Sequence, residues 1–266
     1  QAARALCAHL DCVSVERIEE ELSKLLAAPA PAAYLDEKIL KVIIPELSAP
    51  ALQAAKPAVD ACPAGTEDLP VRWAALLMSL GEDGTRKALK RLRCSNALIE
   101  ETAVLVRGMG GSGGRFLLGH EKGHSIALPT ACGSRVPPQR TVLGETSTAP
   151  GQAPAAHDTV IRIRKLLGRY DLHTVQRLAA LGAAMEPEQA ADFAAQAELA
   201  AQLDADGVCC RVSQLAVNGR DLMAAGIPVG PGLRRTLEAL LDAVIRGQLS
   251  NERQCLLAAA GQISAS

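Results

Sequence analysis

Aromatic residues are nearly absent from this sequence, making up 2% of its 266 residues. Strands favour aromatic and β-branched side chains, whereas helices favour Ala, Leu, Glu, Lys and Arg. Apolar residues still reach 48%, so a core is possible, built mainly from Leu, Ala, Val and Ile. The composition therefore predicts an all-α protein.

The sequence also lacks an excess of charge and a long apolar run. The net charge is −1, so a surface that binds a polyanion has to be a local patch. No run approaches the ~18 apolar residues of a membrane span, and the start, QAARALCAHLDCV, is too polar for a secretory signal. We expect a cytoplasmic protein with neither a membrane nor DNA as a partner. Its first residue is Gln1 rather than Met, which suggests a fragment.

The cysteines form no C-x-x-C pair and no regular framework. In a long, helical chain this pattern indicates reduced thiols rather than a disulfide scaffold. The eight residues are Cys7, Cys12, Cys62, Cys94, Cys132, Cys209, Cys210 and Cys255.

Apolar periodicity and capping residues predict most of the helices. Residues 13–28 form the strongest one, with Ser14 as its N-cap. The other predicted helices cover 34–44, 70–80, 85–107 with a break near Ser95, 159–182, 186–206 and a last segment from Ser250. Residues 48–70 read as loop with a broken helix.

The composition changes at Gly108, where Gly, Pro, Ser and Thr become frequent and the periodicity disappears. A structureless connection of this length is uncommon inside a compact domain. We therefore divide the chain into a helical segment at 1–47, further helices at 48–107, an irregular insertion or linker at 108–158, and C-terminal helices at 159–266.

Residues 218–241, NGRDLMAAGIPVGPGLRRTLEALL, predict two helices joined by a tight turn. Asn218 can cap the first helix with Asp221 in the reciprocal position, and Gly226 suits its left-handed C′ position. Pro231 suits the first turn of the second helix.

This hairpin is also a candidate phosphate site. Amides near Gly230 and Gly232 are free at the start of the second helix, and Arg234 and Arg235 add positive charge. Arg220 lies on the first helix and is included as an RNA-binding candidate. The alternative is that the glycines only permit a tight turn between helices.

Residues 215–257, which include this hairpin, closely resemble the C-terminal region of bacterial CCA-adding tRNA nucleotidyltransferases, in the poly(A) polymerase superfamily. VSVERIEEELSKLL at 13–26 resembles that family's neck helix, while PVRWAALL at 70–77 and ALKRLRCSNALIEETAVLVR at 88–107 resemble its body. By this resemblance, a structural network in the neck would contain Ser14, Glu16, Arg17 and Glu21.

The resemblance implies template-free addition of C, C and A to tRNA 3′ ends from CTP and ATP, with Mg²⁺ held by carboxylates in a catalytic head. Neither the G-G-x-V-R-D-like turn of that head nor the base-reading E-D-x-x-R element occurs here. Two-metal transfer requires such carboxylates, so we expect this chain to bind no cofactor and not to catalyse the reaction alone. In some members a histidine–aspartate metal motif follows the R-W-A-A-L-L-like stretch, where this chain has Met78 and Ser79.

TRKALKRLR at 85–93 carries a second group of RNA-binding candidates. It predicts either a ridge of cations that follows phosphates or a solvated helix face. RIRKLLGRY at 162–170 is a weaker cationic patch. The candidates of the first stretch are Arg86, Lys87, Lys90, Arg91 and Arg93.

HEKGH at 120–124 matches the H-E-x-x-H zinc-hydrolase pattern, with His120 and His124 as ligands and Glu121 as the base. The extended form of the pattern fails, because Ala127 and Thr130 replace its glycine and third histidine. We expect solvated histidines here and keep a zinc site only as an alternative.

The sequence therefore predicts the tRNA-binding neck, body and tail of a CCA-adding enzyme relative. The alternatives are a helical scaffold that does not bind RNA and a zinc-dependent hydrolase built on HEKGH.

Overall fold

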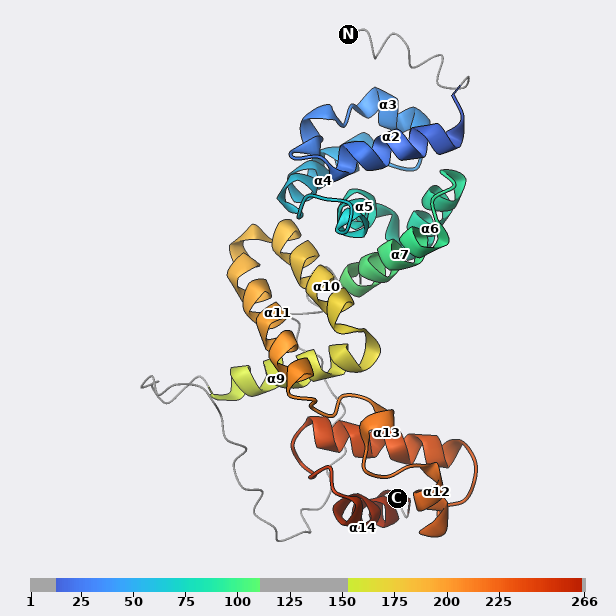
Figure 1. Cartoon of the computed structure of the whole chain (residues 1–266), viewed down its shortest axis with the longest axis vertical. Helices are drawn as coiled ribbons and strands as arrows, with labels where there is room; N and C mark the ends of the chain where they lie inside the picture. Colours follow the sequence, from blue (N-terminus) through green and yellow to red (C-terminus); the bar gives the residue numbers. More distant parts are fainter. Residues whose placement is uncertain (1–12, 111–152, 265–266) are drawn as a thin grey trace. The chain divides into compact units, whose positions relative to one another are not determined.

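The computed structural model describes residues 13–110 and 153–264 (Figure 1). Within these ranges every regular element is an α-helix or a 3₁₀-helix, which confirms the predicted all-α fold. None of the described helices is long and apolar enough to cross a membrane.

The described residues divide into two compact units. The first unit combines the helices up to Gly110 with Leu172–Glu198, and the second combines α9 with the residues from Leu199 onward. Helix α10 thus belongs to the first unit because it packs against α4, α5 and α7. The boundary expected at residue 159 is therefore not the boundary between packing units.

Helix α5 is the centre of the first unit. Every residue from Pro70 to Leu77 is buried, including Trp73, and the helix packs against α2, α4, α7 and α10. The unit contains α2 (Val15–Ala27), η2 (Pro31–Tyr34), α3 (Glu37–Ile43), α4 (Ala49–Ala61), α5 (Leu69–Leu77), η3 (Met78–Leu80), α6 (Gly81–Arg91), α7 (Asn96–Gly110), α10 (Leu172–Met185), η4 (Pro187–Gln189) and the N-terminal part of α11 (Ala190–Ala205).

Several predicted helix ends are confirmed, and two segments differ from the prediction. Ser14 caps α2, and the break between α6 and α7 falls where it was expected. The loop predicted within 48–70 is instead the continuous helix α4, which contains Pro57. A proline removes one intrahelical hydrogen bond, but the buried side chains of Leu52 and Val59 hold this helix on the unit. The single helix predicted over 159–182 is two helices, α9 (Ala153–Arg169) and α10.

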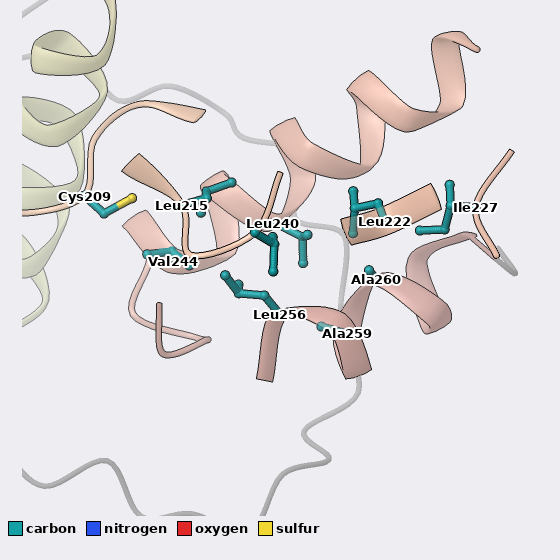
Figure 2. Close-up of a cluster of buried hydrophobic side chains, with 10 residues drawn as sticks. Cys209, Leu215, Leu222, Ile227, Leu240, Val244, Leu256, Ala259 and Ala260 are labelled. Carbon is teal, nitrogen blue, oxygen red and sulfur yellow. The ribbon is translucent and has the colours of Figure 1, made fainter. Parts of the chain in front are cut away.

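The second unit is built around a small aliphatic core in its C-terminal helices (Figure 2). Leu222, Leu240 and Leu256 come from three different helices and are fully buried. The elements are α9, the C-terminal part of α11, η5 (Val212–Gln214), α12 (Gly219–Ala224), α13 (Pro231–Ile245) and α14 (Arg253–Ser264).

Candidate nucleic-acid interface

The predicted hairpin begins with a reciprocal capping box. The Asn218 side chain accepts hydrogen bonds from the amides of Arg220 and Asp221, at 2.9 and 3.2 Å, and Asp221 accepts from the Asn218 amide at 2.9 Å. Arg253 of α14 also donates to the Asp221 carboxylate at 2.6 Å. The first turn of α12 is therefore fixed both to its own cap and to α14.

Gly226 closes α12 in the left-handed conformation, with φ of 91°. Its amide donates to the Met223 carbonyl, and the next amide, of Ile227, reaches back to the Leu222 carbonyl at 3.1 Å. Figure 2 shows the side chains of Leu222 and Ile227 beside each other in the core. This pair of bonds with its apolar contact is a Schellman C-cap, so the predicted role of Gly226 is confirmed.

Helix α13 begins without a side-chain cap. Gly230 occupies the N-cap position with φ of 152°, Pro231 follows at the first helical position, and Gly232 is exposed. A Cβ atom added to either glycine would have no neighbour within 4 Å among the described atoms. The first amides of a helix lack intrahelical acceptors, so this end is open to a negatively charged group.

Three exposed arginines lie on the two helices of the hairpin. Arg220 lies on α12, and Arg234 and Arg235 lie in the first turns of α13. Arg234 is 85% exposed and contacts Glu238 only through Nε, at 2.8 Å. Among the described residues, neither Arg220 nor Arg235 has a carboxylate within ion-pair distance.

An open hollow of about 420 Å³ lies beside the start of α13. Its apolar lining comes from Val212, Leu233 and Leu237, and its polar lining from Arg234 and Glu238. The hairpin thus joins exposed cations, uncovered backbone and a small apolar surface in one place.

The candidate cations of α6 are arranged differently from the predicted ridge. Arg86 pairs with Glu82 of the same helix and with Glu100 of α7. Arg91 donates to Glu46 at 2.5 and 2.8 Å. These arginines tie α6 to neighbouring segments, so they are already partly neutralised.

Arg93 completes this set of ion pairs, because it contacts Glu16 of α2. Lys87 and Lys90 are exposed, and no carboxylate of the described chain lies within ion-pair distance of either. Of the five candidates in residues 85–93, these two lysines are the most available to an RNA phosphate.

The residues predicted as a neck network make contacts, but most of these contacts lie within α2 and its cap. Ser14 caps α2 by accepting from the Arg17 amide at 3.4 Å. The backbone hydrogen bond at Glu16 and the Arg93 guanidinium lower the pKa of Glu16. Glu21 pairs with Lys24 at 3.3 Å, within the same helix. Glu16 is therefore the member that links α2 to another segment, the turn between α6 and α7.

Sequence reasoning missed the buried Arg72. This side chain is 2% exposed and donates only to backbone carbonyls, those of Leu26, Ala28, Cys62 and Pro63. These carbonyls end α2 and α4, where helices leave acceptors unsatisfied. An arginine inside an apolar stretch such as PVRWAALL was the only available signal.

The metal alternatives gain no support from the described chain. HEKGH, with His120, Glu121 and His124, lies outside the described residues. Within residues 13–110 and 153–264 no group of three or more His, Cys, Asp or Glu side chains could hold a metal ion.

Two family models match the chain. One, described as "tRNA nucleotidyltransferase domain 2 putative", covers residues 169–260 and includes the hairpin, and the other, described as "probable RNA and SrmB-binding site of polymerase A", covers residues 1–49. The predicted resemblance to the C-terminal part of CCA-adding tRNA nucleotidyltransferases is confirmed.

A curated relative points to the same family. The CCA-adding enzyme of Limosilactobacillus fermentum is 28% identical over 263 residues, which are 96% of this chain and 52% of that enzyme. The chain therefore spans about half the length of this CCA-adding relative. No solved structure matches.

Proposed function

We propose that this chain binds tRNA in tRNA 3′-end processing, and that the α12–α13 hairpin is a main contact. The observation that carries the proposal is the pair of exposed arginines, Arg234 and Arg235, in the first turns of a helix that has no side-chain cap. This group lies within the segment that matches the tRNA nucleotidyltransferase model.

The chemistry of the hairpin suits a phosphate backbone. Arginine presents a planar fork of donors that matches phosphate oxygens, and Arg234 uses only Nε in its pair with Glu238, which leaves its terminal nitrogens available. Backbone amides at a helix start add further donors. Contacts of this kind position an RNA without reading its sequence.

Nucleotide addition by residues 1–266 is not part of the proposal. The sequence contains no G-G-x-V-R-D-like turn, and transfer through two metal ions depends on carboxylates placed to hold them. The comparisons favour neither the RNA-free scaffold nor the zinc hydrolase.

Fluorescence anisotropy with labelled tRNA tests the proposal over a range of salt concentrations. We expect binding to the whole chain that weakens steeply with salt, because phosphate contacts release counterions. Arg235→Gln should weaken binding and make the salt dependence shallower by about one unit in the log–log slope.

Arg169→Gln is the matched control, since it removes an equal charge from an exposed position on α9. Equal losses in the two variants would point to net charge rather than to the hairpin. If the unmodified chain shows no binding to tRNA at low salt, the proposal is wrong and the scaffold interpretation stands.

A further inference from the structure

Arg164 of α9 points into the second unit, although the sequence placed it in a cationic surface patch. Its Nη1 donates to the carbonyls of Val244 and Ile245, at 3.2 and 2.9 Å, and its Nη2 donates to the Cys209 carbonyl at 2.8 Å. The side chain therefore contacts three carbonyls from two segments of the chain.

The first two of these carbonyls belong to the last turn of α13. A helix leaves its final carbonyls unpaired and carries partial negative charge at that end, so a guanidinium is a favourable partner. No carboxylate of the described chain lies within ion-pair distance of Arg164. Its bonds are thus directional contacts to backbone, which fix position more tightly than a flexible ion pair does.

Arg211 adds further hydrogen bonds between α9 and the segment that follows Cys209. Arg211 donates to the carbonyls of Leu167 and Tyr170 at the end of α9, both at 3.2 Å. A Cβ atom on Gly168 would lie 2.5 Å from the Cys210 carbonyl oxygen, so the two backbones touch there.

Lys165 of α9 adds an ion pair with Asp242 of α13, at 3.1 Å. Burial alone would raise the pKa of Asp242, but its hydrogen bonds to Arg246 and Lys165 outweigh burial and lower it. We call Arg164, Lys165 and Arg211 the α9 clasp.

We propose that Arg164 is a positioning residue for the RNA-binding hairpin, which it serves by fixing α13 against α9. This inference rests on the proposed function. Arg164 holds the C-terminal end of α13, whereas Arg234 and Arg235 lie at the N-terminal end. The 15 residues of α13 span about 22 Å, so a tilt of about 10° at the clasp moves the other end by about 4 Å. A shift of that size exceeds the tolerance of a hydrogen bond to phosphate.

The test compares Arg164→Met with Arg169→Met in the whole chain. Both variants remove one cation from α9, but Arg169 is exposed and outside the clasp. Arg164→Met should weaken tRNA binding about three- to tenfold, as expected when coupling between linked elements is lost. Arg169→Met removes a cation from the same patch but leaves the clasp intact, so it should cost less affinity than Arg164→Met. Circular dichroism checks that the helices are retained in each variant.

The salt dependence separates positioning from contact. Arg164→Met should leave the log–log slope unchanged, because Arg164 touches no phosphate, whereas Arg235→Gln should make the slope shallower. Hydrogen exchange should rise around residues 244–249 in Arg164→Met. Arg164→Lys should recover part of the affinity, since one ammonium reaches some of the carbonyls but cannot span them all.

Four results would overturn the inference. Unchanged affinity in Arg164→Met shows that the clasp does not govern the hairpin, and a shallower slope shows that Arg164 contacts RNA itself. Absence of tRNA binding by the unmodified chain removes the proposed function and this role together. If Arg164→Met loses its helices, the folded variant Arg164→Lys takes its place in the test. Affinity equal to that of the unmodified chain, together with faster hydrogen exchange at residues 244–249, would then contradict positioning.

Discussion

Glu16 and Arg93 lie 77 residues apart in the sequence and form an ion pair between the first turn of α2 and the turn that follows α6. One was predicted as a neck residue and the other as a contact to RNA. Their pairing shows that part of the positive charge of residues 85–93 holds the first unit together. Fewer cations are therefore available for the proposed contact with RNA than the charge pattern of the sequence suggested.

The conformation of Arg93 gives a first prediction about stability. Arg93 follows the C-cap of α6, Leu92, in the left-handed conformation, with φ of 58°. A non-glycine residue pays about 1–2 kcal/mol there, while glycine loses about 0.4–1 kcal/mol through the freedom of the unfolded chain. Arg93→Gly should therefore be about 0.5–1 kcal/mol more stable than Arg93→Ala by urea unfolding. Both variants lack the ion pair, so equal stability would contradict the strained backbone.

Arg72 should be essential for the stability of the first unit. Arg72→Met removes every donor to the four carbonyls that end α2 and α4, and we expect unfolding to become easier by about 3 kcal/mol or more. Arg17→Met is the control, since exposed substitutions change stability by only about 0.5 kcal/mol. Chemical unfolding monitored by the fluorescence of Trp73 reports on this unit, and similar midpoints for the two variants would contradict the role of Arg72.

Gly182 permits the close packing of α10 on α11. An added Cβ atom would lie 2.4 Å from the ring of Phe193, which is fully buried. Gly182→Ala gains up to about 1 kcal/mol of helix propensity but overpacks the core, so we expect a net loss of about 1–2 kcal/mol.

Gly261→Ala is the matched control because the same atom meets nothing within 4 Å on α14. This variant should gain about 0.5–1 kcal/mol in thermal unfolding measurements. A gain of stability in both variants would show that Phe193 can move aside.

The buried thiols should react slowly in the folded protein. Burial raises the pKa of both Cys62 and Cys94 to about 12. The thiolate is the reactive form, so almost none is present at pH 8. Cys255 is partly exposed and should be alkylated before the buried Cys62 and Cys94. Mass spectrometry after a brief treatment with iodoacetamide measures the order, which denaturant should abolish.

Much of the fold could be predicted from local signals. Low aromatic content indicated helices, and residues such as Ser14, Asn218 and Gly226 marked helix ends, because a cap is decided by a few neighbouring residues. The helical course of α4 could not be read in this way. Pro57 argues against a helix locally, and only burial against other helices offsets its cost.

The candidate site likewise has features that the local sequence predicts and features that only the packing of the helices determines. The sequence alone determined the helical class, the glycine-closed hairpin and the family resemblance, because these depend on residue types at short spacing. Only the tertiary structure decided which cations remain available: Arg234 and Arg235 stay exposed, whereas Arg93 meets a carboxylate and Arg164 meets carbonyls that are distant in the chain. The sequence determines which residues are charged, whereas the packing of the helices determines which carboxylates or carbonyls lie beside each charged side chain.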